Sequence, residues 1–221
     1  MNGAGDVFKH LPGDGWLVIV DELPAVGGEC SLLADHFIRR INLSNTPMHI
    51  TPKTVDNHIS SALIDDLEII LDSQVETVDL ADASLVQHAS PGLILLWGGG
   101  DAKTWIASLE IEMLGSSINN AICDGALLFS AGGAASALGS WAVDDLSAQP
   151  IPGLDWLPGA IVLPWINDPA ESNSVRELLA KWEAAYALGL AKGRLFAFGP
   201  HGQVEVWGGA APTVVLGSDW G

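Results

Sequence analysis

The chain has 221 residues, of which 48% are hydrophobic and only 16% charged. This composition predicts one folded domain with a large core and excludes an intrinsically disordered chain. The formal net charge is −18, from nine Lys and Arg against 27 Asp and Glu. Because such a surface repels phosphate groups, we expect no nucleic-acid partner and no membrane-surface partner.

The first residues, 1–14, are polar and rich in glycine. We interpret them as a flexible leader that precedes a single α/β domain over residues 15–221. They lack the basic start and apolar stretch of a signal peptide, and no apolar run approaches the ~18 residues that span a bilayer. Cys30 and Cys123 form neither a metal-ligand pair nor a disulfide framework. A cytoplasmic protein without metal or cofactor is the resulting expectation.

In the first half of the chain, strand patterns alternate with helix patterns. Short apolar runs predict strands, and apolar residues three or four positions apart predict helices. In chain order we predict a strand over 16–20, a helix over 31–41 capped by Ser31, a strand over 47–50, a helix around 63–71, strands over 75–80 and 92–97, and a helix over 101–113 capped by Asp101.

The second half continues this alternation and closes with three short strands. We predict a strand over 125–129, a helix over 130–138, a Pro- and Gly-rich connection over 149–158, a strand over 160–163, a helix over 171–188, and strands over 194–198, 203–207 and 213–216. The turn at 199–202 joins two of these into a hairpin. The predicted fold is a three-layer α/β/α sandwich with a mostly parallel sheet and a C-terminal β-hairpin.

The most informative segment runs from the apolar strand over 125–129 directly into Ser130 and then into Ala131-Gly132-Gly133. A nucleophile elbow has this layout, because a strained strand-to-helix turn exposes the nucleophile and small neighbours allow close packing. We therefore predict Ser130 as a nucleophile whose hydroxyl emerges at the turn. The alternative is that Ser130 is an ordinary helix N-cap.

A second segment, Trp97-Gly98-Gly99-Gly100-Asp101, follows the predicted strand over 92–97. Glycines at the carboxyl end of a parallel strand lie where open α/β sheets bind ligands, and their N–H groups suit an oxyanion hole opposite Ser130. The alternative is a plain turn before a helix capped by Asp101. The spacing fits neither dinucleotide- nor phosphate-binding loops.

Together, Gly99-Gly100-Asp101, Ser130-Ala131-Gly132 and the motif over 153–159 (GLDWLPG) carry a resemblance. They are similar to the serine peptidase family of cyanophycinase and aspartyl dipeptidase (dipeptidase E), which has a class I glutamine amidotransferase-like fold. The resemblance implies Ser130 as nucleophile and an oxyanion hole from Gly98, Gly99 or Gly100 with the N–H of Ala131. It covers residues 60–205, and the sequence departs from it in two places: Leu128 stands where the family has a glycine two residues before the serine, and Trp165 stands where it has the histidine base.

Indole cannot accept a proton, so the base that the family supplies is missing at Trp165. Only His201 follows Ser130 in the sequence. It is either a relocated base or a solvent-exposed turn histidine.

Two functions remain open at this point. We favour a non-catalytic homologue that binds a small-molecule or peptide ligand, with Trp156 and Trp165 forming an aromatic pocket with Asp101 beside Ser130. The alternative is an active serine hydrolase that uses Ser130 with His201. The apolar, Trp-rich composition is also consistent with a homodimer.

Overall fold

The computed structural model describes residues 13–23, 28–42, 44–52, 58–79, 91–110, 114–144, 149–182, 184–190, 193, 195–207 and 213–217. The first 12 residues of the predicted leader lie outside these ranges. The end of that leader is packed rather than loose, because the amide of Asp14 donates to the carbonyl oxygen of Cys123 at 3.3 Å. None of the described helices is long and apolar enough to cross a membrane.

The larger sheet has seven strands and a parallel centre. Its strands are β1 (Trp16–Val20), β2 (Met48–Thr51), β3 (Glu76–Asp79), β4 (Leu93–Leu96), β5 (Leu127–Ala131), β10 (Leu195–Phe198) and β11 (Val204–Trp207). They lie in the order β11-β10-β1-β5-β4-β2-β3. The five strands from β1 to β3 in this order are parallel, and β10 and β11 form the predicted hairpin, in which β10 pairs antiparallel with both β1 and β11. The carboxyl ends of β1, β5, β4 and β2 therefore meet at one edge.

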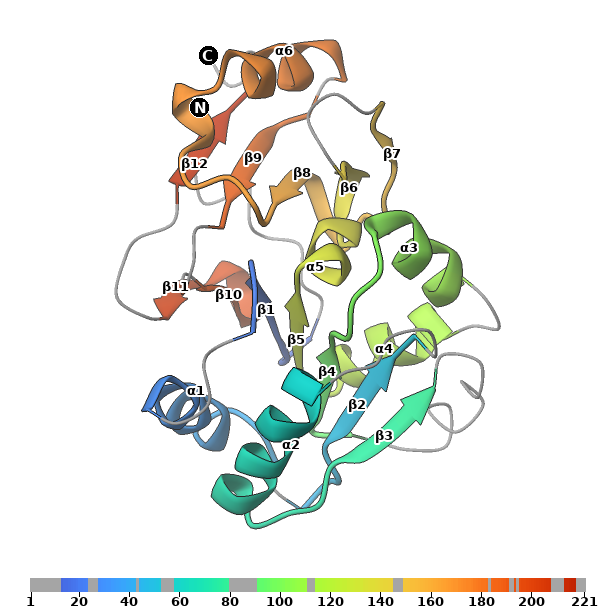
Figure 1. Cartoon of the computed structure of the whole chain (residues 1–221), viewed down its shortest axis with the longest axis vertical. Helices are drawn as coiled ribbons and strands as arrows, with labels where there is room; N and C mark the ends of the chain where they lie inside the picture. Colours follow the sequence, from blue (N-terminus) through green and yellow to red (C-terminus); the bar gives the residue numbers. More distant parts are fainter. Residues whose placement is uncertain are drawn as a thin grey trace.

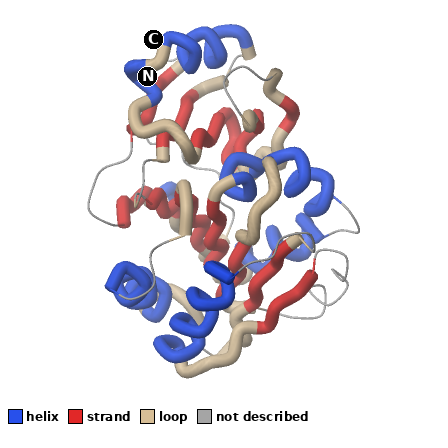
Figure 2. The backbone as a smooth tube through the Cα atoms, viewed as in Figure 1, coloured by secondary structure: helices blue, strands red, loops and turns tan. Residues whose placement is uncertain are grey.

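A second sheet has five strands in the order β12-β9-β8-β6-β7. These strands are β6 (Gly139–Ala142), β7 (Ile151–Pro152), β8 (Leu157–Leu163), β9 (Tyr186–Gly189) and β12 (Thr213–Leu216). Figure 1 shows it above the larger sheet, with the helix over Asn173–Lys181, α6, beyond it. The tube in Figure 2 shows the same arrangement, with helices on both sides of the strands.

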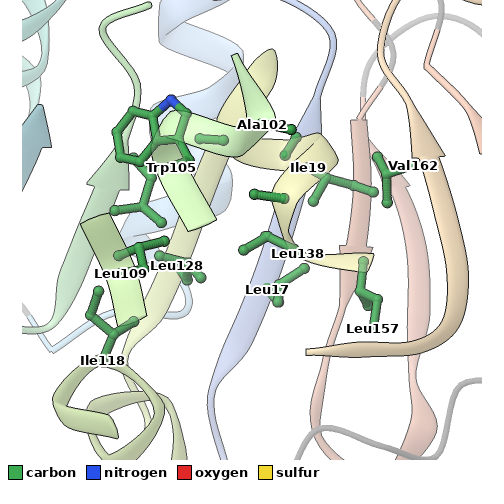
Figure 3. Close-up of a cluster of buried hydrophobic side chains, with 14 of the residues drawn as sticks. Leu17, Ile19, Ala102, Trp105, Leu109, Ile118, Leu128, Leu138, Leu157 and Val162 are labelled. Carbon is green, nitrogen blue, oxygen red and sulfur yellow. The ribbon is translucent and has the colours of Figure 1, made fainter. Parts of the chain in front are cut away.

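Three apolar clusters define the layers. The helices are α1 (Gly28–Ile38), α2 (His58–Leu71), α3 (Ala102–Glu110), α4 (Leu114–Cys123), α5 (Gly133–Ala137) and α6. One face of the larger sheet packs on α1 and α2, and the other packs on α3, α4, α5 and the second sheet. Helix α6 covers the outer face of the second sheet. Figure 3 shows Leu157 and Val162 of β8 facing Leu17, Ile19 and Leu138 in the shared core. The predicted α/β/α fold is confirmed.

Two predicted helices differ from the structure. The helix expected over 130–138 begins only at Gly133, because β5 continues through Ser130 and Ala131. The helix expected over 171–188 ends at Lys181, and its last residues form β9, which pairs with β8 and β12. The apolar run over 184–190 suits either element, and pairing on both sides decides for a strand. In addition, Ser31 lies inside α1 rather than at its start, and α4 and β6 were not predicted.

His49 on β2 is a buried histidine whose two ring nitrogens both have partners. Nε2 lies 3.3 Å from the carbonyl oxygen of Trp97, Nδ1 lies 3.5 Å from Thr77 Oγ1, and the side chain is 2% exposed. Burial lowers the pKa of His49 to about 4, although the hydrogen bond to Trp97 opposes this shift. The unfolded chain therefore binds more protons than the native protein between about pH 4 and 6.5.

We expect acid to destabilise the fold through His49. Stability is full above about pH 6.5, and His49 removes about 2 kcal/mol from the free energy of unfolding between pH 6.5 and 5. His36 acts in the same direction, because burial and the Arg40 charge lower its pKa. Urea unfolding at pH 7.5, 6.5 and 5 measures the slope of the free energy of unfolding against pH. His49→Gln should flatten most of this slope, and equal slopes in wild type and His49→Gln would contradict the assignment.

Candidate functional site

The strand-to-helix turn after β5 lies at Gly132. This residue has φ 58° and ψ −125°, a positive-φ conformation that side-chain-bearing residues rarely adopt, and α5 begins at the next residue. Its amide donates to the carbonyl oxygen of Val20 at 3.1 Å, and its carbonyl oxygen accepts from the amide of Ser136 at 3.0 Å. The strained turn that an elbow requires is therefore present, and its central residue is Gly132.

Ser130 lies two residues before that turn, inside β5. It pairs with Ile19 on one side and with Leu96 on the other, and it is 0% exposed. Its Oγ has no hydrogen-bond partner. The expectation that the Ser130 hydroxyl emerges at the corner is wrong, because the strand runs two residues further than the sequence pattern indicates. Ser130 is not a helix N-cap either.

The triple-glycine loop and the turn after β5 are in direct contact. A Cβ placed on Gly133 would lie 2.3 Å from the carbonyl oxygen of Gly100 and 3.2 Å from the carbonyl carbon of Asp101. Gly98, Gly99 and Gly100 all have positive φ angles, and Gly99 and Gly100 are exposed. The indole of Trp105 donates to the Gly99 carbonyl oxygen at 2.9 Å, which holds the loop on α3.

The predicted oxyanion partner Ala131 is the last residue of β5 and pairs with Val20. The residue that directly follows the turn is Gly133 instead. The amide expected at Ala131 for an oxyanion hole therefore corresponds to that of Gly133, two residues later. The nucleophile position shifts in the same way, from Ser130 to Gly132.

Asp101 caps α3, as predicted. Its Oδ1 accepts from the amide of Thr104 at 2.8 Å and from Thr104 Oγ1 at 2.5 Å. These hydrogen bonds lower the pKa of Asp101 below its ordinary value. A second carboxylate, Asp144, accepts from the amide of Ala102 at 2.8 Å. The carboxylates of Asp101 and Asp144 thus accept hydrogen bonds from amides in the first turn of α3. Asp101 is therefore a capping residue at the rim of the triple-glycine loop.

His201 lies at the other edge of the sheet. It is exposed, in the short 3₁₀ turn Pro200–Gly202 between β10 and β11, and Phe198 at the end of β10 pairs with Leu17 near the start of β1. Gly132 instead contacts Val20 at the end of β1. The length of β1 from Leu17 to Val20, about 10 Å, therefore separates the turn that carries His201 from Gly132. The hypothesis that His201 acts as a base for this turn is therefore wrong.

Trp156 and Trp165 come from opposite ends of β8. Trp156 precedes the strand and is half-buried near Gly115, whereas Trp165 follows it and is 45% exposed. A strand of this length spans about 20 Å. The expected cluster of both indoles beside Ser130 is therefore wrong.

The motif over 153–159 has a structural role in the described residues. The amides of Leu154 and Leu157 donate to the carbonyl oxygens of Ala137 and Leu138, each at 2.9 Å, which ties the motif to the end of α5. Ser140 Oγ donates to Asp155 Oδ1 and accepts from the amide of Gly159. The motif thus joins α5 to β8.

Comparison with known proteins bears on the fold. No family model and no curated protein matches the sequence. Among solved structures, a peptidase from an acI-B1 Actinobacterium is similar with a TM-score of 0.65 and 18% identity, over 95% of this chain and 96% of that one. A provisionally assigned peptidase E protein from Listeria monocytogenes EGD-e is similar with a TM-score of 0.56 and 12% identity, over 90% of this chain and 100% of that one.

The chain has a peptidase E-like fold. At these identities the likeness concerns the fold alone. Within it, the residue that sequence reasoning missed is Gly132 at the turn. One signal for Gly132 was present in the sequence: Leu128 did not fit the glycine position of the elbow pattern, and a shift of two residues places the much smaller Ser130 there.

Proposed function

We propose that this chain is a non-catalytic protein with a peptidase E-like fold that binds a small molecule or peptide at the carboxyl edge of its larger sheet. One observation carries the proposal: the residue at the strained turn is Gly132, which has no side chain. A serine peptidase needs a nucleophile at that turn and a base within hydrogen-bond reach of it.

The serine nearest in sequence does not replace the missing nucleophile. Ser130 Oγ is buried in β5 without a partner that could take its proton. Among histidines whose side chains are described, His36 stacks on Trp207, His49 is bonded to Trp97 and Thr77, and His201 lies at the opposite edge. By resemblance, the position of the family's base holds Trp165, which cannot act as one.

The turn keeps the space that a nucleophile would use. A Cβ on Gly132 would have one neighbour within 4 Å, the carbonyl oxygen of Asp21 at 3.5 Å, which is an ordinary van der Waals contact. The fold thus retains the corner and the glycine loop while the reactive group is absent. This combination favours binding over hydrolysis.

Labelling with a fluorophosphonate probe tests the proposal. We expect wild type and Ser130→Ala to show the same background, because no described serine is activated at the turn. A double variant, Gly132→Ser with Trp165→His, serves as the positive arm, since it restores both family groups; circular dichroism checks that it folds, because side chains at positive φ cost about 1–3 kcal/mol. Wild-type labelling that disappears in Ser130→Ala would overturn the proposal.

A further inference from the structure

Exposed apolar side chains gather on two edge strands of the molecule. Among the described residues, seven large hydrophobic side chains are exposed, and four of them lie on β11 and β12. These strands end the larger sheet and the second sheet, respectively. The four residues are Val204 and Val206 of β11, and Val214 and Leu216 of β12. Because single exposed apolar side chains are common, their arrangement decides whether they form a surface.

The two valines of β11 continue the face of the larger sheet that packs on the second sheet. Directly opposite residues of an antiparallel pair point to the same face. Val204 pairs with Phe198 and Val206 with Phe196, and both phenylalanines belong to the core that the two sheets share. Trp207, one residue further, packs in the layer on the opposite face. The valines therefore extend the shared core to the rim of the larger sheet.

The same alternation on β12 directs Val214 and Leu216 toward the larger sheet. Val214 pairs with Leu188 and Leu216 with Tyr186, and both partners belong to the shared core. Val215 points to the other face, where it packs on the cluster that α6 covers. Figure 1 shows β11 and β12 at the same side of the molecule. The core between the two sheets therefore ends at this side in four exposed aliphatic side chains.

The β12 strand lacks the features that usually protect an edge strand. Natural edge strands carry charged residues, prolines or bulges that prevent pairing with another chain. Residues 213–216 (TVVL) contain no charge and no proline, and their pairing with β9 runs through all four residues without a register shift. Because β12 ends its sheet, the backbone groups that point away from β9 face outward. This edge can therefore pair with a further strand.

The distribution of charge favours a second copy of the chain as the partner. Because the net charge is −18, two copies repel one another over most of their surface. The stretch over 206–218, however, contains no charged residue, and Glu205 before it forms an ion pair with Arg40. Two copies can therefore approach along this neutral stretch. Its apolar side chains leave water when they meet the same side chains of an identical strand.

We propose that two copies of this chain associate through β12, in antiparallel pairing about a two-fold axis at Val215. This register places Val214 of one copy opposite Leu216 of the other, so that the inward-facing side chains form one continuous apolar row. An axis at Val214 would instead oppose Leu216 to Pro212, which has no N–H for a ladder. Because both sheets end at the same side, the axis also brings the exposed valines of the two β11 strands toward one another.

Cysteine cross-linking tests the register. Val215→Cys places two thiols opposite one another across the axis, so mild oxidation with diamide should give a covalent dimer on a non-reducing gel. Thr213→Cys is the matched control, because its thiols in the two copies would lie four residues apart along the strands, about 14 Å. Both variants keep Cys30 and Cys123, which therefore give the same background. Absence of a cross-link at position 215, or equal dimer bands in the two variants, would overturn this register.

Sedimentation equilibrium tests the association itself. We expect the mass of wild type to rise from 23.1 kDa toward twice that value as its concentration increases. Added NaCl should strengthen the dimer, because salt screens the repulsion between two acidic chains. Leu216→Gln keeps the charge and should weaken association about tenfold, since each dimer loses two apolar contacts. Ile69→Gln is the control, because Ile69 is also exposed but lies on α2, and it should leave association unchanged.

Three results would overturn the proposal. They are a wild type that stays monomeric at every concentration, a dimer that Leu216→Gln and Ile69→Gln weaken equally, and a dimer that added salt dissociates. A monomeric wild type that binds an extended peptide of alternating valine and threonine would assign the edge to a strand of another protein and exclude the second copy. None of these results bears on the proposed function, which concerns the carboxyl edge of the larger sheet.

Discussion

Replacing Gly133 by alanine is expected to lower the free energy of unfolding by about 3 kcal/mol, because the new methyl group would overlap the backbone of the glycine loop. The Cβ would lie 2.3 Å from the Gly100 carbonyl oxygen, and neither atom sits at the end of a flexible side chain that could move aside. Urea unfolding followed by tryptophan fluorescence measures the loss. The indole of Trp105 donates a hydrogen bond to the Gly99 carbonyl oxygen, so the glycine loop cannot move away from the new methyl group without losing that bond.

Two other glycines serve as controls for this prediction. Gly125 has φ 99° and no atom within 4 Å of its Cβ position, so Gly125→Ala measures the backbone strain of a positive φ alone, about 1–2 kcal/mol. Gly132→Ala should behave like Gly125→Ala, because its Cβ meets only the Asp21 carbonyl oxygen at 3.5 Å. A loss at Gly133 no larger than at Gly125 would contradict the close contact between loop and turn. The contrast between Gly132 and Gly133 matters for function, since it identifies which of the two positions has room for a side chain.

Much of the fold was predictable because its strands are apolar runs bounded by glycine or proline. The strands around residues 16–20, 93–96 and 195–198 are buried on both faces, and such runs are recognisable without knowing their neighbours. What the pattern could not supply is where a strand stops. Ala131 and Gly132 are both small, and only pairing with Val20 keeps Ala131 in the strand ladder while the chain turns at Gly132.

The turn was predicted at Ser130 and lies at Gly132, and this difference of two residues decided the candidate site. The triplet Ser130-Ala131-Gly132 resembles a family motif in its amino-acid sequence, yet the turn lies at its third residue rather than its first. The neighbours along this sheet edge were also beyond reach of the sequence, because Asp21, Thr51 and Trp97, which follow or end β1, β2 and β4, are far apart along the chain. Strand order alone brings them to one edge. His201 was misplaced for a related reason: the antiparallel direction of β10 carries the hairpin turn to the amino edge.

Arg40→Ala is the second substitution with a large expected effect. The guanidinium lies over the rings of both Trp16 and Trp207, at 4.6 and 4.8 Å from their centroids, and Nη2 lies 2.5 Å from Glu205 Oε2. It thereby joins the segment after α1 to β1 and to β11. Removing it forfeits two cation–π contacts, an ion pair and the packing of the side-chain stem, and we expect a loss of about 3 kcal/mol in the free energy of unfolding.

The neighbouring Arg39 provides the matched control, because it is exposed on the same turn and its replacement by alanine should change stability by less than about 0.5 kcal/mol. Arg40→Lys keeps the charge but loses the planar group that stacks on indole rings, so we expect an intermediate loss. Urea unfolding measures all three variants, and the emission of Trp16 and Trp207 should shift to the red in Arg40→Ala as both rings gain water contact. Equal stability of Arg39→Ala and Arg40→Ala would mean that Trp16 and Trp207 pack equally well without the cation over their rings. The hairpin would then be held by its strand pairing with β1 alone.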